Sequence, residues 1–325
     1  MILAGIDEAG YGPVLGPLVV GCCAFELPDV EWTSPTQPLP CLWKRLRKLV
    51  GKSRHKTGKK LHVNDSKLVY SPSTGIKELE RAILTIAGTR FGWADELDRF
   101  IAHVHPELID DLREYSWYAP LEASFPLASD GTSLRLFTNA LRLEMDRSKT
   151  TCVHLAARVL TERRYNRMID QTRNKAAVLF STGAAHIDHL LREFGERGLV
   201  IFCDRQGGRE HYGHNLRLMF EEWQLEIVHE QDGRSEYRLH KGPYVVRVIF
   251  CEKAEAQCMP VAVASMLAKY LREALMHRFN AWWQSHLPDL QPTAGYYTDG
   301  MRFLGDIAAK RAELGIADEA LIRSR

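Results

Sequence analysis

Residues 4–21 read A-G-I-D-E-A-G-Y-G-P-V-L-G-P-L-V-V-G, and this stretch carries the strongest fold signal in the chain. The apolar runs 2–6 and 18–25 predict two neighbouring strands, joined as a hairpin or meander by a turn rich in glycine and proline. Asp7 and Glu8 end the first run. Acids at a strand end, beside backbone that a ligand can approach closely, indicate a metal next to a phosphate. The alternative is an ordinary strand turn with two solvated acids.

Further apolar patterns predict the rest of the fold. Residues 199–203 form a short continuous apolar run, which is typical of a central strand buried on both faces. Residues 225–230 and 244–250 predict two more strands. Strands followed by helices in this order predict an α/β fold in which helices flank one mixed sheet. Helical spacing marks four segments: residues 75–88, 133–164, 174–194 and 261–283.

The composition is that of an ordinary globular enzyme. The 325 residues are 45% hydrophobic and 26% charged. No apolar run approaches the roughly 18 residues of a membrane helix. The seven cysteines include no C-x-x-C pair, which argues against a zinc ribbon, and their odd number without a disulfide pattern fits a reducing compartment. We therefore expect a cytoplasmic monomer without a leader or a membrane span.

One segment is strongly basic although the formal net charge of the chain is only +2. Residues 43–60 are rich in lysine and arginine and contain no acid. Such a patch suits the phosphate backbone of a nucleic acid. The alternative is a solvated surface loop.

Four acids occur in comparable positions along the chain. Asp7 and Glu8 end the first strand, Asp204 ends the buried strand 199–203, and Glu255 precedes the last long helix. Carboxylates suit hard cations such as Mg²⁺ or Mn²⁺, and two such ions about 3.5–4 Å apart support phosphodiester cleavage. Because neighbouring residues of a regular strand point to opposite faces, Asp7 and Glu8 line one site only if the strand ends or bends there.

Five segments together resemble the type 2 ribonucleases H, the family of ribonuclease HII and ribonuclease HIII. Residues 4–21 are similar to the opening motif of that family. The other matches follow in the family's order: N-D-S-K at 64–67, I-F-C-D at 201–204, K-A-E at 253–255 with A-V-A-S-M-L-A-K-Y-L-R-E at 262–273, and G-Y-Y-T at 295–298.

The resemblance implies a ribonuclease H-like fold and metal-dependent endonucleolytic cleavage of RNA in RNA–DNA hybrids, leaving 3′-hydroxyl and 5′-phosphate ends. Residues 1–285 would form the catalytic domain, with a basic insertion at about 27–62 and a segment at about 90–170 that matches nothing in the family. Residues 286–325 would complete the substrate face. The implied metal-binding and catalytic residues are Asp7, Glu8, Asp204 and Glu255, and the implied substrate contacts are Gly10, Tyr11, Gly12, Lys67 and Tyr296.

The chain departs from the family at two of these positions. Tyr11 stands where the family has Arg or Thr between its glycines, which puts recognition of an RNA–DNA junction in doubt. Glu255 stands where Asp is usual, and the extra methylene shifts the carboxylate by about 1 Å, a distance that matters in catalysis. Two alternatives therefore stay open: the same metal site acting on a different nucleic acid, and a non-catalytic nucleic-acid-binding protein.

Other polar residues have weaker signals. Ser265, Lys269 and Glu273 share one helix face, as a polar stripe with an ion pair or as support for the acids. Asp65 is expected to shape the turn that positions Ser66 and Lys67. The remaining candidates are histidines: His186 and His189 as metal ligands or packing residues, and His211, His214 and His240 as proton carriers near Asp204.

Overall fold

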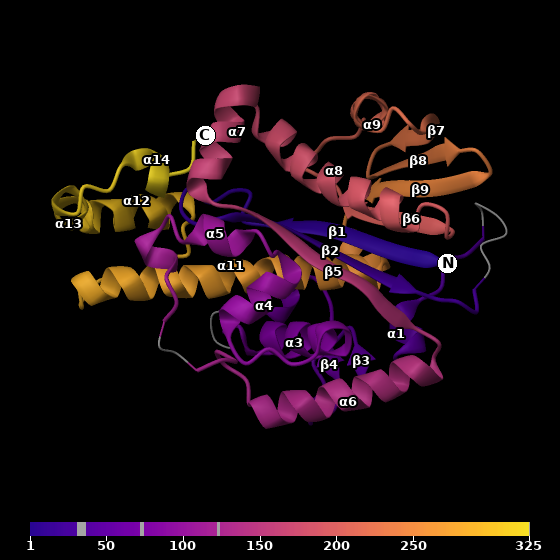
Figure 1. The fold of residues 1–325 in the computed structure, drawn as a ribbon, viewed down its shortest axis with the longest axis horizontal. Coiled ribbons are helices and arrows are strands. Elements are labelled where there is room, and N and C mark those ends of the chain that lie inside the picture. The colour runs from indigo at the N-terminus through magenta and orange to yellow at the C-terminus, as the bar shows by residue number, and fades with distance from the viewer. Residues whose placement is uncertain (31–36, 72–74, 122–123, 325) are drawn as a thin grey trace.

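The computed structural model describes residues 1–30, 37–71, 75–121 and 124–324. Its centre is a seven-stranded sheet in the order β5-β2-β1-β6-β9-β8-β7, with helices on both faces (Figure 1). The predicted α/β class with a mixed sheet is confirmed. The strands are β1 (Ile2–Ala9), β2 (Leu18–Glu26), β5 (Thr151–Leu160), β6 (Leu199–Asp204), β7 (Gln224–Gln231), β8 (Arg234–Lys241) and β9 (Tyr244–Cys251).

Strand direction brings three chain segments to one edge of the sheet. β1, β6 and β9 run parallel to one another, whereas β2, β5, β7 and β8 pair antiparallel with their neighbours. The carboxyl ends of parallel strands lie at the same edge, where ligands commonly bind in open α/β sheets. The ends of β1 and β6 carry two of the predicted acids, Asp7 and Asp204.

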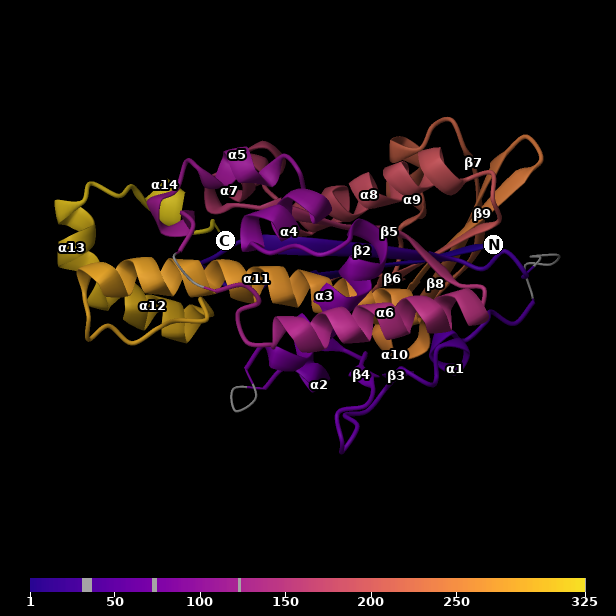
Figure 2. The ribbon, with the colours of Figure 1, turned by 60° about the horizontal axis from the view of Figure 1, so that its bottom comes forward.

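One face of the sheet is covered by α11 (Met259–His286), which packs on β1 and β2 (Figure 2). Two glycines permit this close packing, because a side chain at either position would clash with the backbone of α11. A Cβ atom on Gly5 would lie 2.1 Å from the backbone nitrogen of Val261, and one on Gly21 would lie 2.3 Å from the carbonyl oxygen of Ala264. Helix α11 is thereby held directly over the strand that carries Asp7.

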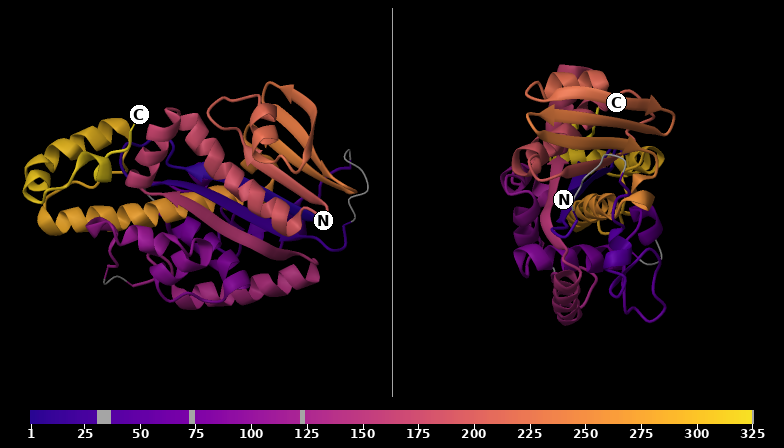
Figure 3. Two further views of the ribbon diagram at one scale, coloured as in Figure 1. Left: turned by 45° about the horizontal axis from the view of Figure 1, so that its top comes forward. Right: turned by 90° about the vertical axis from the view of Figure 1, so that its right-hand side faces the viewer.

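The other helices complete the two layers. Helix α8 (Lys175–Phe194) lies over the opposite face of the sheet, as Figure 3 shows, and begins at Asn174, whose side chain accepts hydrogen bonds from the first turn. The helices on the side of α11 are α3 (Lys77–Phe91), α4 (Leu97–Val104), α5 (Leu108–Leu112), η1 (Ser116–Tyr118) and α6 (Gly131–Arg147), and those on the side of α8 are α7 (Glu162–Thr172) and α9 (Gly213–Met219).

Two strands differ from the sequence-based expectation. The helical assignment of residues 133–164 is wrong in its second part, because β5 lies between α6 and α7. β5 is an edge strand with one exposed side, so its apolar alternation is weak. β8 was not predicted, since R-S-E-Y-R-L-H-K is too polar to indicate a strand, although Tyr237 and Leu239 are fully buried.

The basic insertion is only partly irregular. Its described residues include α1 (Leu42–Arg45) and the two-residue strands β3 (Val50–Gly51) and β4 (Leu61–His62), and their apolar side chains enter the core. Residues 31–36 of the insertion lie outside the described residues. The N-D-S-K motif at 64–67 leads into the short helix α2 (Ser66–Val69).

The C-terminal region consists of a turn and short helices: α12 (Tyr297–Asp306), α13 (Ala308–Glu313) and α14 (Asp318–Leu321). Helix α11 continues across the proposed boundary at residue 285, and the division into two parts stays a prediction. Within the described ranges, no helix is both long and apolar enough to cross a membrane.

Candidate active site

Three segments place the four predicted acids near one another. The parallel register pairs Ile6 with Cys203, so Asp7 and Asp204 are neighbours near the carboxyl ends of β1 and β6. β1 continues in regular pairing with β2 to Ala9, so it does not end at Asp7 and Glu8 as the sequence suggested. Glu255 lies on α10 (Ala254–Gln257), and the backbone N–H of Ala254 donates to Asp204 Oδ1 at 3.1 Å. Asp204 therefore fixes the start of the short helix that carries Glu255.

Mutual repulsion and burial perturb all four carboxyl groups. Burial, followed by the charges of Glu8 and Asp204, raises the pKa of Asp7 well above its usual value. Burial and Asp204 raise the pKa of Glu8 to about 7. Burial also raises the pKa of Asp204 and of Glu255, which share a hydrogen bond. The structure thus places Asp7, Glu8 and Asp204 within electrostatic reach of one another, and Glu255 within reach of Asp204.

The oxygen atoms of the four carboxyl groups do not converge on one position. Asp7 is 8% exposed and Glu255 is 9% exposed. No three of these four described side chains bring oxygen atoms all within 4.8 Å of one another. Lys67 is a cation whose charge lowers the pKa of Glu8 and of Asp204. Carboxylate oxygens are the ligands that hard divalent cations take in proteins.

A chain of hydroxyl groups supports Asp7 from α11. Ser265 is buried and forms a hydrogen bond to Asp7 that opposes the rise of its pKa. The hydroxyl oxygens of Ser265 and Ser66 are hydrogen-bonded at 3.0 Å. Asp65 caps α2 by accepting from the backbone N–H of Lys67 at 2.9 Å, which confirms its role in the turn. Its charge also raises the pKa of Glu255, so Asp65 lies near the acids in addition to shaping the turn.

The glycine-rich turn is bonded to α11 through Arg272, and its backbone is accessible at Gly12. Gly10 and Gly16 have φ values of +86° and +79°, a conformation that favours glycine. The buried Arg272 of α11 donates to backbone carbonyl groups of the turn. Gly12 is exposed, and a Cβ atom there would meet nothing within 4 Å. The backbone at Gly12 is therefore accessible to a ligand.

The C-terminal region also contacts this turn. Arg323 donates to the carbonyl oxygens of Gly10 and Tyr11, the second at 3.2 Å. Tyr11 is half-buried, and a Cβ atom on Gly207, in the loop after Asp204, would lie 3.9 Å from its ring. Sequence reasoning missed Arg323 and the role of Arg272, because nothing in the local pattern marks an arginine that binds distant backbone.

The remaining predicted residues lie on different sides of the acids. Tyr296 is 52% exposed. Its phenol group acts electrostatically on Tyr70 and on Arg272, so Tyr296 lies near both of these side chains. The ammonium group of Lys269 pairs with Glu273 at 2.6 Å and lies 4.6 Å from the ring centre of Tyr70. These contacts agree with the predicted polar stripe on α11, in which Lys269 pairs with Glu273.

The predicted histidines lie apart from the acids. His211 and His240 pair with Glu230 and Glu226, on or beside the β7–β8 hairpin, each at 2.8 Å. His214 is exposed on α9. His186 faces β2 and β5, on the opposite side of the sheet from Ser265.

Fold and site together define an α/β protein with an acidic centre at the carboxyl edge of its sheet. No family model and no curated protein match the chain. Solved structures that resemble it include ribonuclease HII of Archaeoglobus fulgidus, in a complex with PCNA, at 15% identity and a TM-score of 0.44, with 100% of this chain and 95% of that chain covered. Ribonuclease H2 of Pyrococcus horikoshii follows at 14% identity and a TM-score of 0.41, with 99% and 92% covered.

A third neighbour is Bst-RNase HIII in complex with Mn²⁺, at 15% identity and a TM-score of 0.39, with 99% of this chain and 66% of that chain covered. These neighbours are ribonucleases of the HII, H2 and HIII types. Because identities and TM-scores are low, the proposals below depend on the residues of this chain.

Proposed function

We propose that the protein is a Mg²⁺- or Mn²⁺-dependent endoribonuclease that hydrolyses RNA phosphodiester bonds in RNA–DNA hybrids and leaves 3′-hydroxyl and 5′-phosphate ends. One observation carries this proposal: the charges of Glu8 and Asp204 raise the pKa of Asp7, and Glu255 is hydrogen-bonded to Asp204, so acids from three segments are linked near one sheet edge. Structural carboxylates of this kind are ordinarily paired with cations of the protein, and here the excess negative charge calls for a bound divalent ion.

The four acids would hold two divalent ions. Such ions activate a water molecule and stabilise the leaving oxygen of a phosphodiester. Ser265 keeps the Asp7 carboxylate oriented and favours its ionised form through the hydrogen bond described above. Ala254 does the same for Asp204 from its backbone N–H. The chain thus holds the metal-binding oxygens in place before a substrate arrives.

The substrate would lie along the glycine-rich turn. The open backbone at Gly12 and the neighbouring Gly10 and Tyr11 would follow the sugar–phosphate chain, and exposed Lys67 would contact a phosphate. Exposed Tyr296 would stack on a sugar near the cleavage site, where the 2′-hydroxyl group distinguishes RNA from DNA. Residues 286–325 would complete this face, which the contact of Arg323 with Tyr11 supports.

The protein is further proposed to act as a monomer in the cytoplasm. All seven cysteines are free, which is compatible with a reducing compartment.

The test is cleavage of an end-labelled RNA–DNA hybrid in Mg²⁺ or Mn²⁺. We expect cleavage by the wild type that stops when the metal is chelated, and a loss of at least about 100-fold in Asp7→Asn. Asp188→Asn, a substitution on the exposed side of α8, is the matched control and should cleave like the wild type. A metal-saturated, folded wild type that cleaves no hybrid would reject the proposal.

The second candidate is a nuclease with the same metal centre and another substrate, because Tyr11 replaces the residue usual in the family. A panel of hybrid, double-stranded RNA, single-ribonucleotide duplex and DNA separates the two activities. A non-catalytic binding protein is the third reading. Metal-independent binding that Asp204→Asn leaves unchanged, without cleavage of any substrate in the panel, would favour it.

A further inference from the structure

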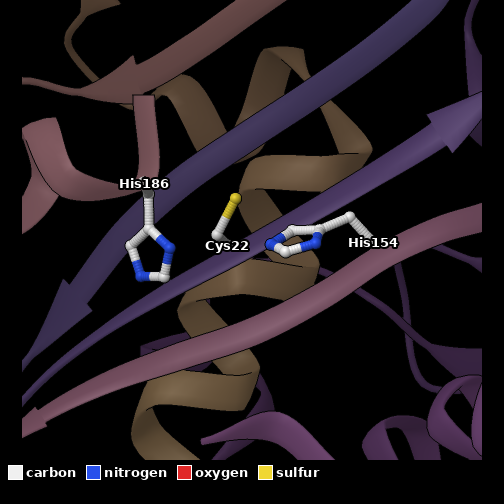
Figure 4. A group of neighbouring side chains, drawn as sticks. All are labelled: Cys22, His154 and His186. Carbon is white, nitrogen blue, oxygen red and sulfur yellow. The ribbon is translucent and has the colours of Figure 1, made fainter. Parts of the chain in front are cut away.

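We propose that Cys22, His154 and His186 form a binding site for a divalent ion that prefers sulfur and nitrogen ligands, with Zn²⁺ as the fitting ion. Their ligand atoms, the cysteine sulfur and one nitrogen from each imidazole, all lie within 4.8 Å of one another. Figure 4 shows the two imidazole rings on either side of Cys22. Among the described residues, this is the group of three that satisfies so close a spacing.

The fold explains why these three residues meet. The register of β2 and β5 pairs Ala24 with His154, so Cys22 and His154 are diagonal neighbours on the same face of two adjacent strands. His186 reaches this face from α8. Asp7 faces the opposite layer, where Ser265 of α11 contacts it. The cysteine–histidine site and the Asp7 side chain therefore lie on opposite faces of the sheet.

The hydrogen bonds leave ligand atoms available. His186 Nε2 lies 3.0 Å from the carbonyl oxygen of Val20. A carbonyl group only accepts, so Nε2 carries the proton and Nδ1 keeps a free lone pair. Metal-binding histidines commonly have their second nitrogen fixed in this way. His154 Nε2 is buried and has no hydrogen-bond partner among the described residues, a costly arrangement that a metal bond would resolve.

The electrostatic state of the side chains suits a ligand role. Burial lowers the pKa of both His154 and His186 to about 3, so both imidazoles are neutral at physiological pH. Burial raises the pKa of the Cys22 thiol, while the nearby Arg158 lowers it. Zinc would bind the thiolate and displace the thiol proton, as metals do at cysteine ligands.

A cleft gives access to the site. It has a volume of about 350 Å³, and its lining includes His154, His186, His189 and Arg158. Three protein ligands leave a fourth tetrahedral position for a water molecule from this cleft. The His189 ring lies 4.5 Å from that of His154, centre to centre, but outside the group of three. One thiolate and two imidazoles select Zn²⁺ over the Mg²⁺ or Mn²⁺ suited to the acids.

Such an ion would join the edge strand β5 to β2 and α8, and its test is independent of the nuclease proposal. Full-length protein freed of metal is titrated with Co²⁺, whose bond to a thiolate gives a near-ultraviolet charge-transfer band that oxygen ligands do not give. Zn²⁺ is then added as competitor. The matched pair is Cys22→Ala and Cys23→Ala, because both cysteines are fully buried on β2 but point to opposite faces.

We expect one Co²⁺ with a thiolate band per wild-type chain, its displacement by Zn²⁺, and the same band in Cys23→Ala. Cys22→Ala should lack the band. His154→Gln, at a half-buried position, should bind Co²⁺ at least about tenfold more weakly and serves if Cys22→Ala does not fold. The absence of a band in folded wild type, its persistence in Cys22→Ala, or unchanged affinity in His154→Gln would overturn the proposal.

Discussion

The guanidinium group of Arg272 donates to the carbonyl oxygen of Pro17 at 2.6 Å and thereby fastens the glycine-rich turn to α11. The same side chain donates to Leu15 at 3.0 Å and to Ala294 at 2.9 Å, and only 1% of it is exposed. A Cβ atom on Gly10 would lie 2.9 Å from the Arg272 side chain, so the turn closes tightly over it. One buried arginine thus links the predicted substrate turn, the long helix and the C-terminal region.

We predict that Arg272→Lys destabilises the protein by about 3 kcal/mol, because a lysine cannot serve three carbonyl groups in this geometry and leaves buried acceptors unsatisfied. Urea denaturation measures this loss. The exposed Arg192→Lys is the control and should change stability by less than about 0.5 kcal/mol. Equal stability of Arg272→Lys and the wild type would show that the turn does not depend on this contact.

Ser265→Ala is predicted to weaken divalent-ion binding by about tenfold, since the Asp7 carboxylate loses a hydrogen bond that favours its charged form. Cleavage at saturating metal should change much less than cleavage at low metal. The measurement is the Mn²⁺ dependence of hybrid cleavage. Ser181→Ala, which removes a hydroxyl bonded only within α8, is the control. An unchanged metal dependence in Ser265→Ala would contradict the supporting role.

Lys67→Ala is predicted to weaken hybrid binding at every sequence and to reduce the slope of log affinity against log salt by about one. The reason is that an exposed lysine beside the acids would neutralise one phosphate. Fluorescence anisotropy at several salt concentrations, in Ca²⁺ to prevent cleavage, measures the slope. Lys241→Ala, whose ammonium pairs with Glu222, should leave it unchanged. Identical slopes for wild type and Lys67→Ala would exclude the phosphate contact.

Glu162 gives a prediction about pH and stability. It accepts a hydrogen bond from Tyr118 at 2.7 Å, its second oxygen has no partner in the described part of the chain, and burial raises its pKa to about 7 from 4.5. The folded state therefore keeps the proton up to about pH 7, whereas the unfolded chain releases it near 4.5. The contribution to stability is present below pH 4.5 and disappears as pH rises through 7.

Glu162→Gln removes this dependence. Relative to the wild type, the variant should gain about 3 kcal/mol in free energy of unfolding between pH 4.5 and pH 8. Urea denaturation at both pH values provides the comparison, with the exposed Glu193→Gln as control. If the difference between variant and wild type does not change with pH, Glu162 ionises normally in the folded protein.

The elements that the sequence predicts correctly are those with two buried faces or a long apolar stripe. β1, β2, β6 and α11 have continuous apolar runs, so their positions follow from pattern alone. The proximity of Asp7 and Asp204 is consistent with the parallel pairing of β1 and β6. β5 and β8 were not predicted, because β5 lies at an edge of the sheet and β8 is mostly polar.

Contacts that depend on strand register were not accessible from the sequence. Cys22 and His154 become neighbours only because β2 pairs with β5 in one register, and β5 itself was not recognised. His186 was considered with His189, three residues away, although its close partners come from other strands. Long-range contacts of this kind contain no local periodicity and appear only in the folded chain.

The measurement that tests the central claim most directly is Mn²⁺ binding by electron paramagnetic resonance together with hybrid cleavage, in the same samples of wild type and Asp204→Asn. If the four acids form one cation centre, Asp204→Asn loses tightly bound Mn²⁺ and at least about 100-fold in cleavage together. Wild-type levels of both bound Mn²⁺ and cleavage in Asp204→Asn would contradict the account.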